Sequence, residues 1–270
     1  MARSQKAFLG IDIGGTKIEG ILWRSGKILR VQKLKTPKNR QKFLSAVFDL
    51  IESLRKDVSA AGIGIALAGA TDLRTGKVIH SPNLPFINGL NLKKLLEARF
   101  AIPVRVDNDS RCFLRGEINF GSSKEKKNVV GMIIGTGVGG ALYLEGKMIY
   151  GKHGFAGEQG MAKLIVGKSI LSIEDLVSSH GFKRLGGKRS AAVYRKVGKY
   201  LGLHLANLVE IFNPELIIIG GGVTDAGSQL LRPALAEMRR HVVFPKQFWP
   251  QIRFSKLKHA GALGAISLFK

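Results

Sequence analysis

The feature that most constrains the fold is a pattern of strand, glycine turn and strand that occurs twice. The first copy, AFLGIDIGGTKIEGILW, covers residues 7–23, and the second, VVGMIIGTGVGGALYLEG, covers residues 129–146. In each copy, two short apolar runs on either side of a glycine-rich turn predict a pair of neighbouring strands. The repetition indicates two related halves within one chain.

The segments that follow each copy continue in the same order. In the first half we expect strands at residues 28–34, 62–67 and 104–106 and helices at 41–56 and 92–100. In the second half we expect strands at 147–150 and in ELIIIGGGV (215–223), and a long helix at 191–212 with apolar side chains at spacings of three and four. The sequence therefore predicts an α/β protein with two domains of β-β-β-α-β-α order facing each other across a cleft.

The domain boundaries follow from the same pattern. The polar stretch FGSSKEKKN (120–128) is the expected link between an N-terminal domain at residues 1–120 and a C-terminal domain at 121–255. A last helix at 261–269, within the segment 256–270, is expected to pack back on the first domain. With 270 residues, of which 45% are hydrophobic, the chain is long enough for two cores of moderate size.

Several classes of protein are excluded by simple features. No apolar run approaches the roughly 18–20 residues that a membrane helix needs, and the basic N-terminus lacks the apolar core of a secretory signal. We therefore expect a cytoplasmic protein. Cys112 is the only cysteine, so neither a disulfide within the chain nor a cysteine-based zinc site can form.

The charge balance is strongly basic. Lysine and arginine total 43 against 19 acidic residues, which gives a formal net charge of +24. Such a charge attracts polyanions, so phosphorylated ligands, polyphosphate and nucleic acid are all favoured as partners. The basic residues are dispersed, however, and aromatic residues that could stack on bases are not interleaved with them. A solvated basic surface is the simpler interpretation, and polyanion binding stays open.

Three glycine-rich turns offer bare backbone amides to which phosphate oxygens could come close. The first turn holds Gly14, Gly15 and Thr16, with the charge of Lys17 beside it. The second covers residues 135–140, and the third is Gly220-Gly221-Gly222. A single glycine turn between strands is common, but two at matching places in a repeat favour a nucleotide whose phosphates contact both halves. Neither the dinucleotide GxGxxG pattern nor the P-loop pattern is present.

Acidic residues lie beside these turns. Asp12 ends the first strand, where it could bind a magnesium-bound water, and residues 107–109 (Asp-Asn-Asp) end another strand at the start of a helix. One acid there is explained as a helix N-cap, worth about 1 kcal/mol, and either Asp107 or Asp109 could fill that role. Two acids and an amide in a row are not explained by capping alone, so a general base and a cap both remain open for Asp109.

These residues together resemble the ROK family of sugar kinases, which have the actin-like, ribonuclease H-like ATPase fold. The resemblance covers nearly the whole chain and rests on six motifs in the family's order: GIDIGGTK (10–17), GIALAGATD (64–72), SPNLPFINGLNL (81–92), DNDSRCFLRGE (107–117), IIGTGVGGALYLEGKMIYGKHGFAGEQG (133–160) and FNPELIIIGGGV (212–223). It implies transfer of a phosphoryl group from ATP, with Mg²⁺, to glucose or a related hexose or N-acetylhexosamine. It also implies a homodimer.

The resemblance assigns roles to the sugar-binding residues. Asp109 would be the catalytic base on the 6-hydroxyl of the sugar, and Asn83, Asn108 and Glu158 would form hydrogen bonds to the sugar. Gly69 would shape the floor of the pocket. These roles favour base over cap for Asp109.

The resemblance also assigns the nucleotide-binding residues, which are all in the glycine turns. They are Gly14, Gly15, Thr16 and Lys17 in the first turn, Gly135, Thr136, Gly137 and Gly139 in the second, and Gly221 and Gly222 near the adenosine. Asp12 would hold Mg²⁺ through water.

Three departures from the family pattern bear on the substrate. Met161 replaces the histidine of A-G-E-x-G-H, and the cysteine-rich zinc loop that normally follows is missing. Methionine is at best a poor zinc ligand, so with the cysteines also missing we expect no structural zinc. Because methionine cannot donate a hydrogen bond to a sugar, we expect an altered or relaxed selectivity at the first carbons of the sugar. Residues 68–70 are Ala-Gly-Ala instead of Pro-Gly-Pro, which makes this turn less rigid. The segment at 181–189 is also shorter than in many relatives.

Three functions fit the sequence. An ATP-dependent hexose kinase is the leading hypothesis, because the proposed base, the metal acid and the phosphate loops are all present. A polyphosphate-dependent glucokinase would make use of the high positive charge. A non-catalytic sugar-binding ROK protein would explain the loss of the histidine. Only residues 1–6 precede the first strand, so we expect no helix-turn-helix module for DNA binding.

Overall fold

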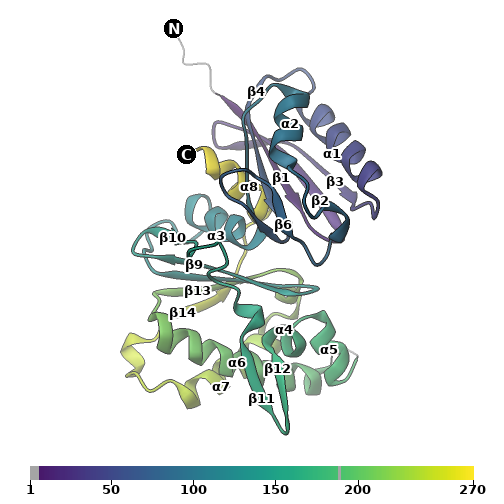
Figure 1. Ribbon diagram of the computed structural model, residues 1–270. Helices are drawn as coiled ribbons and strands as arrows, with labels where there is room; N and C mark the ends of the chain where they lie inside the picture. Colours follow the sequence, from purple (N-terminus) through teal and green to yellow (C-terminus); the bar gives the residue numbers. More distant parts are fainter. Residues whose placement is uncertain (1–5, 188–189) are drawn as a thin grey trace. The chain divides into compact units, whose positions relative to one another are not determined.

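The computed structural model describes residues 6–187 and 190–270 and divides into two compact units (Figure 1). The first comprises the chain up to Lys124 together with Gly151–Phe155 and Leu257–Lys270, and the second comprises Glu125–Tyr150 and Ala156–Lys256. In the part of the chain that the structure describes, no helix is both long enough and apolar enough to cross a membrane.

The first unit is built on a five-stranded mixed sheet with the order β3-β2-β1-β4-β7. Strands β1, β2 and β3 pair antiparallel, whereas β1, β4 and β7 run parallel. The strands are β1 (Ala7–Ile13), β2 (Lys17–Arg24), β3 (Lys27–Lys35), β4 (Ala60–Leu67) and β7 (Val104–Asn108). Successive side chains of a strand point to opposite faces, so this sheet has two faces to cover.

Different helices cover the two faces of this sheet. Helices α1 (Arg40–Arg55) and α2 (Leu92–Phe100) pack with the side chains of Leu9 and Ile11 in one core cluster. The intervening Gly10 faces α8 (Ala260–Ile266), where a Cβ would lie only 2.1 Å from the carbonyl oxygen of Ala262. The missing side chain of Gly10 thus lets α8 approach the sheet closely.

The remaining elements of the first unit are short or belong to the predicted site. Helix α3 (Asp109–Asn119) follows β7 directly. A small hairpin and two single turns complete the unit: β5 (Ala70–Thr71), β6 (Val78–His80), η1 (Pro85–Ile87) and η5 (Ser267–Phe269).

The second unit repeats the sheet of the first, with the order β10-β9-β8-β13-β14. Here β8, β9 and β10 pair antiparallel, and β8, β13 and β14 run parallel. The strands are β8 (Val129–Ile134), β9 (Val138–Leu144), β10 (Lys147–Ile149), β13 (Leu216–Gly220) and β14 (Gln251–Phe254). The repeated strand order confirms the duplication predicted from the glycine turns.

Helices α6 (Ala191–Phe212) and α7 (Ser228–His241) pack against each other in the second unit. Gly202 of α6 permits this contact, because a Cβ there would lie 2.4 Å from the carbonyl oxygen of Ala234. The shorter elements are β11 (Lys163–Val166), β12 (Ser169–Ser172), α4 (Ile173–Val177), α5 (Ser179–Leu185), η2 (Gln159–Met161), η3 (Gly222–Ala226) and η4 (Lys246–Phe248).

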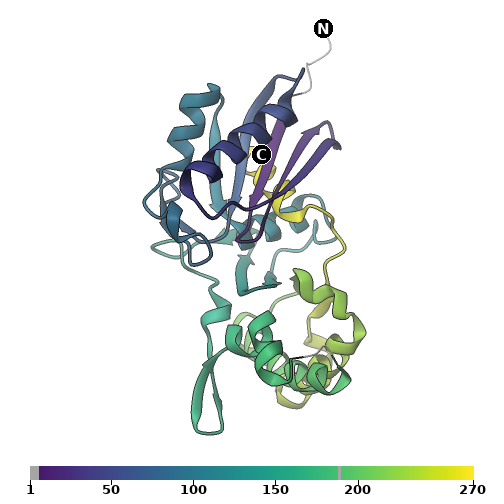
Figure 2. The same ribbon diagram turned by 90° about the vertical axis from the view of Figure 1, so that its right-hand side faces the viewer.

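The predicted elements are found with shifts of one or two residues at their ends, and the helices at 92–100 and 191–212 have the predicted bounds. The predicted β-β-β-α-β-α order is found in both units, with short elements inserted: the hairpin β5–β6 before α2 in the first unit, and a hairpin and two short helices before α6 in the second. The hairpin β11–β12 extends from the rest of this unit (Figure 2), and its outward-facing Ile165 is 81% exposed. The domain boundaries expected from the sequence stay a prediction.

Candidate active site

The turn between β1 and β2 is held mainly through its carbonyl oxygens. Thr36 Oγ1 donates to the Gly14 carbonyl at 2.7 Å, and Lys38 Nζ donates to the Gly15 carbonyl. A Cβ on Gly15 would lie 2.7 Å from Cβ of Asn83, so the missing side chain lets Asn83 pack on this turn. The structure thus brings a predicted sugar-binding residue against a predicted phosphate loop. Lys38, which was not among the predicted site residues, adds a cation here.

Asp12, at the end of β1, lies among other carboxylates. It is opposite Glu19 in the register of β1 and β2. Burial, with the nearby charges of Asp109 and Glu19, raises the pKa of Asp12 to about 7, although Lys17 lowers it. Gly261 leaves room for this side chain, since a Cβ there would lie 2.5 Å from Asp12 Oδ2.

Glu19 is a buried acid that the sequence analysis did not single out. Burial disfavours its ionised form, but hydrogen bonds from Lys33 and His259 hold its pKa below the usual value. Lys33 Nζ lies 2.7 Å from Oε1 and His259 Nδ1 lies 3.1 Å from Oε2. An ionised carboxylate is therefore fixed beside Asp12.

These acids fit a hydrated magnesium ion. Mg²⁺ usually keeps several waters and takes one or two carboxylates together with substrate phosphates. A divalent cation at Asp12 would offset the burial and the carboxylate repulsion that raise its pKa. Within residues 6–187 and 190–270, no three His, Cys, Asp or Glu side chains are grouped so that they could hold a metal by themselves.

The start of α3 is capped by Asn108, so the expectation that Asp107 or Asp109 would be the cap is wrong. Asn108 Oδ1 accepts from the backbone N–H groups of Ser110 at 3.0 Å and Arg111 at 3.2 Å. Asp107 is still in β7, and Asp109 is already the first residue of the helix, so neither stands at the cap position. Removing the capping role from Asp109 leaves its carboxylate for another purpose.

Asp109 is oriented by its neighbours. Its Oδ1 accepts from Asn108 Nδ2 at 3.1 Å and from the N–H of Ser110 at 2.8 Å. Asn108 Nδ2 also donates to the carbonyl of Gly69 at 3.1 Å. Gly69 has φ +135°, and a Cβ would lie 2.6 Å from the carbonyl oxygen of His80, so glycine is needed there. The structure thus joins Gly69, Asn108 and Asp109 through hydrogen bonds.

Asp107 belongs to a buried ion pair behind this corner. Its Oδ1 lies 2.6 Å from Nε of Arg111, and Arg115 approaches the other oxygen at 3.7 Å. Arg111 also donates from Nη1 to the carbonyl of Gly154 at 2.8 Å. Arg111 was not among the predicted site residues, although it lies only four residues after Asp107 in sequence.

The turn between β8 and β9 is braced from α4 and α5. The N–H of Val138 donates to Glu174 Oε2 at 2.8 Å, and Ser179 donates from both N and Oγ to the Gly135 carbonyl. A Cβ on Gly137 would lie 2.5 Å from the same Glu174 oxygen. Glu174 and Ser179 were not predicted, because they follow this turn by about 36–44 residues in sequence.

The third glycine turn meets the second. Gly221 has φ +87°, and a Cβ there would lie 2.5 Å from the carbonyl oxygen of Ile134, at the end of β8. Thr136, Gly221 and Gly222 are exposed. The two predicted nucleotide-binding turns of the second unit are therefore adjacent.

The glycines around Glu158 serve close packing on β9. A Cβ on Gly160 would lie 2.0 Å from the Val138 carbonyl oxygen, and one on Gly157 would lie 3.1 Å from Cα of Ala141. Gln159 buries its amide and donates to the Gly131 carbonyl at 3.2 Å. The backbone on both sides of Glu158 is thus fixed, while its side chain is exposed.

The predicted site residues fall into two groups. The first unit holds Asp12, Gly14, Gly15, Thr16, Lys17, Gly69, Asn83, Asn108 and Asp109. The second unit holds Gly135, Thr136, Gly137, Gly139, Glu158, Gly221 and Gly222.

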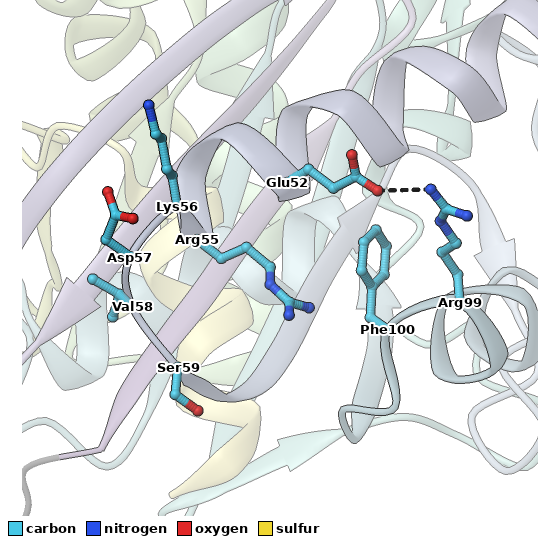
Figure 3. A pocket seen from close by; sticks show the side chains of 8 residues that line it. All are labelled: Glu52, Arg55, Lys56, Asp57, Val58, Ser59, Arg99 and Phe100. Atoms are coloured by element: carbon cyan, nitrogen blue, oxygen red, sulfur yellow. Dashed lines mark hydrogen bonds and ion pairs between the residues drawn. The ribbon is translucent and has the colours of Figure 1, made fainter.

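A surface cavity of about 600 Å³ lies elsewhere, at the C-terminal ends of α1 and α2 (Figure 3). Arg55 points toward Phe100, with its guanidinium carbon 5.7 Å from the ring centroid. Arg99 pairs with Glu52 at 2.8 Å. Cations at helix C-termini complement the helix dipole, which accounts for these arginines. None of the predicted site residues lines this cavity.

Comparison with known proteins identifies relatives along the whole chain. The family model described as "ROK family" matches residues 8–168 and 172–270. A glucokinase of Streptomyces coelicolor is 27% identical, with coverage of 87% of this chain and 88% of the relative. An N-acetyl-D-glucosamine kinase of Escherichia coli is 29% identical, with coverage of 95% and 96%.

Solved structures agree with this assignment. A ROK family glucokinase from Streptomyces griseus, in complex with glucose and AMPPNP, superposes with a TM-score of 0.86 at 26% identity, covering 97% of this chain and 98% of that one. An inorganic polyphosphate/ATP-glucomannokinase from Arthrobacter superposes with a TM-score of 0.76 at 25% identity, covering 98% and 100%. The predicted actin-like ATPase fold is confirmed, and the chain belongs to the ROK family.

Proposed function

We propose that this chain is an ATP-dependent hexose kinase that transfers the γ-phosphoryl group to the 6-hydroxyl of glucose or a related hexose or N-acetylhexosamine. The observation that carries the proposal is that the first unit holds both an oriented Asp109, which accepts from Asn108 and Ser110, and Asp12, whose pKa is raised by burial and by the nearby charge of Asp109. Phosphoryl transfer needs a base for the attacking hydroxyl and an acid for the metal. The names of the relatives, glucokinase and N-acetylglucosamine kinase, support the same reaction.

Asp109 is the proposed general base. Donors from Asn108 and Ser110 converge on its Oδ1, which orients the carboxylate. An oriented carboxylate can accept the proton of the sugar's 6-hydroxyl as the hydroxyl oxygen attacks the γ-phosphorus. The leaving group is then ADP.

Asp12 is the proposed partner of a hydrated Mg²⁺, with Glu19 as a second negative charge beside it. When bound, the ion would neutralise charge on the phosphates of ATP. Gly14, Gly15, Thr16 and Lys17 are proposed to form one phosphate-binding turn, and Gly135, Thr136, Gly137 and Gly139 a second. The N–H groups of Gly14 and Gly135 close these turns by donating to the carbonyls of Lys17 and Gly137. Gly221 and Gly222 are proposed to lie near the adenosine.

The proposed sugar site consists of Asn83, Asn108, Asp109 and Glu158, with Gly69 shaping its floor. Met161, which stands where the family has a histidine, is 47% exposed and close in sequence to Glu158. Because methionine donates no hydrogen bond, selectivity at the first carbons of the sugar would rest mainly on Glu158. A coupled assay with glucose, N-acetylglucosamine, N-acetylmannosamine, mannose and fructose identifies the acceptor.

The test of this function is Asp109→Asn. Loss of the base should lower kcat by about 10²- to 10⁴-fold, while the Kd for ATP changes little, because the phosphate loops are untouched. Asp72→Asn, which alters an exposed acid in a turn of the same unit, is the matched control and should keep wild-type turnover. Near wild-type turnover in Asp109→Asn would show that the mechanism is wrong.

A polyphosphate donor is the second candidate, favoured by the net charge of +24 and by the similarity to a polyphosphate/ATP-glucomannokinase. Donor competition between ATP and polyphosphate at two salt concentrations separates the candidates, because binding of a long polyanion weakens more steeply with salt. Calorimetric titration with sugars alongside turnover tests the third candidate, a sugar-binding protein without activity. A homodimer, a cytoplasmic location and the absence of zinc stay predictions.

A further inference from the structure

Arg111 is a fully buried arginine that the proposed reaction does not use. Its side chain is only 2% exposed and is among the largest fully buried side chains of the described residues. Burying a guanidinium group is costly unless its charge is paired and its donors are satisfied. A buried arginine in α3, next to the corner that carries Asp109, therefore calls for an explanation.

The contacts of Arg111 connect two separate parts of the chain. Nε pairs with Asp107 Oδ1 at 2.6 Å, and the same oxygen accepts the N–H of Asn108 at 2.8 Å. Nη1 donates to the carbonyl of Gly154 at 2.8 Å, over a separation of 43 residues. One guanidinium group thus bonds both to the end of β7 and to the segment Gly151–Phe155.

Gly154 has little else to hold it. It has φ +81°, and a Cβ there would meet no atom within 4 Å, so the backbone is in a conformation that favours glycine and is not packed on that side. The base of this loop is closed by the N–H of Ala156, which donates to the Tyr150 carbonyl at 3.1 Å. Arg111 therefore supplies an anchor near the middle of the loop.

Glu158 follows this loop directly in sequence. Beyond it, the chain is fixed by the close approach of Gly157 and Gly160 to β9. The direction in which the chain enters that fixed segment depends on where Gly154 is held. A change of a few tenths of an ångström there is enough to weaken a hydrogen bond that Glu158 accepts from a ligand hydroxyl.

We propose that Arg111 is a positioning residue for sugar binding. It holds the Gly151–Phe155 loop, which leads to Glu158, on the same Asp107 carboxylate that anchors the base-bearing corner at Asn108 and Asp109. The effect on sugar rests on the proposed function, whereas the effect on the loop does not. Arginine is required because its fork reaches an acid and a carbonyl at once, which the single ammonium group of lysine does not do.

The test is Arg111→Lys, which keeps a cation beside Asp107 but gives up the bond to Gly154. Truncation to alanine is avoided, because a buried carboxylate without its partner costs about 3–5 kcal/mol and can unfold the protein. The matched control is Arg115→Lys, which alters the other arginine beside Asp107, 24% exposed and 3.7 Å from Oδ2. A thermal melt shows that each variant is folded.

Two measurements are made on the variants. Hydrogen exchange by mass spectrometry should show amides in the peptide 151–158 of Arg111→Lys exchanging about tenfold faster, the change expected on losing one hydrogen bond of about 1.4 kcal/mol. Steady-state kinetics should show the KM for sugar rising about tenfold, with the KM for ATP within about twofold of wild type. Arg115→Lys should change neither.

The outcomes separate this proposal from the proposed function. Unchanged exchange in the peptide 151–158 overturns the anchoring, and faster exchange with an unchanged KM for sugar overturns the positioning role. If the wild-type protein phosphorylates no sugar, the proposed function fails, and the Kd for sugar measured by calorimetry replaces KM. A Kd that rises with faster exchange supports the positioning role. Should Arg111→Lys fail to fold, the pair Asp107→Asn with Arg111→Gln removes both charges, and the same two measurements decide.

Discussion

The two units share one sheet but not its chemistry. The order β3-β2-β1-β4-β7 of the first corresponds strand by strand to β10-β9-β8-β13-β14 of the second. In each sheet, the last but one residue pair before the glycine turn can be compared. Asp12 lies opposite Glu19 in the first sheet, whereas Ile133 lies opposite Gly139 in the second. A repeated backbone thus carries two acids in one copy and none in the other. The difference supports our proposal that the metal and the base are held by the first unit.

The turns themselves are stabilised by opposite charges. In the first unit, Lys38 and Thr36 donate to carbonyl oxygens of the turn, whereas in the second the carboxylate of Glu174 accepts from the N–H of Val138. Cations beside the first turn suit the highly charged end of a nucleotide. The second turn, with an acid already bound to one of its amides, suits a less charged part.

The largest expected effect on kcat in this comparison comes from replacing Asp12, one of the two acids that distinguish the first unit from the second. Asp12→Asn should lower kcat by about 10²- to 10³-fold, as expected when a group that stabilises charge in the transition state is removed. Ile133→Val, at the equivalent place in the second unit, should leave kcat within about twofold, since a small apolar change alters no charge. Both are measured by steady-state kinetics at saturating ATP and sugar.

The dependence of the rate on Mg²⁺ gives a second test of Asp12→Asn. The variant should also need more Mg²⁺ to reach half its maximal rate. Equal losses in both variants would mean that the acids do not distinguish the two units.

The sequence predicted the duplicated fold because its signals are local. Alternating apolar residues and glycine turns are visible within short windows, and they placed α6 at the bounds that the structure has. The contacts that refine the site are not local. Arg111 reaches Gly154 across 43 residues, and Glu174 reaches Val138 across 36 residues, and no short pattern reports such pairs.

The cap of α3 shows a second kind of limit on sequence-based prediction. Asp107, Asn108 and Asp109 are all good capping residues, so composition alone does not select one. The strand β7 extends to Asn108 through its pairing with β4, which puts the asparagine at the cap position. Tertiary pairing decides between residues that local chemistry treats as equal.

Glycines offer the next test, because a glycine packed within a strand of the first unit can be compared with an open one in a turn of the second. A Cβ on Gly64 in β4 would lie 2.0 Å from the backbone oxygen of Ala265, so Gly64→Ala forces α8 away from the sheet. We expect a loss of about 3 kcal/mol in the free energy of unfolding, at the upper end for overpacking, measured by urea denaturation. The KM for ATP of the folded enzyme should change little.

Gly135 in the second unit is the contrasting position. A Cβ there would meet no atom within 4 Å, so Gly135→Ala should leave the free energy of unfolding nearly unchanged. The added methyl group would instead obstruct a phosphate that approaches the turn, and the KM for ATP should rise several-fold. If Gly135→Ala destabilises the protein without affecting ATP, this turn is structural and not part of the nucleotide site.

The dependence of stability on pH tests the electrostatic environment of Asp12 in the first unit. The pKa of Asp12 is raised from 3.8 to about 7, so between these values the folded protein binds a proton that the unfolded chain has lost. The contribution of Asp12 to the free energy of unfolding is therefore fully present below about pH 4 and is lost as the pH rises through 7. Asp12→Asn should raise the free energy of unfolding by roughly 4 kcal/mol at pH 8 and by little at pH 4.

Asp72 provides a control of opposite sign. Hydrogen bonds from the backbone of Thr75 and from its side chain hold the pKa of Asp72 below its usual value. Its contribution is present at neutral pH and is lost as the pH falls through the lowered pKa, so Asp72→Asn should destabilise at pH 8 and not at low pH. Equal pH profiles for the two variants would contradict the assigned environment of Asp12.

The smallest expected changes in the free energy of unfolding come from replacing one exposed acid in each unit. Glu52 in the first unit pairs with Arg99 at 2.8 Å beside the cavity in Figure 3, and both side chains are at least 50% exposed. Glu215 in the second unit is 38% exposed and 3.5 Å from Lys126, but it also accepts from the N–H groups of Lys127 and Asn128 at 2.7 and 2.9 Å. These amides immediately precede β8, so Glu215 holds the entry of that strand.

An exposed ion pair contributes at most about 1 kcal/mol and commonly less, because water screens the charges and two long side chains lose freedom. Glu52→Gln should therefore change the free energy of unfolding by about 0.5 kcal/mol or less. Glu215→Ala removes two backbone hydrogen bonds as well and should cost roughly 1–2 kcal/mol. Urea denaturation at low and high salt distinguishes the contributions, since salt weakens the ion pairs and leaves the backbone bonds. Losses of equal size at high salt would mean that Glu215 acts only as a surface charge, and the second unit would then lack this polar anchor for β8.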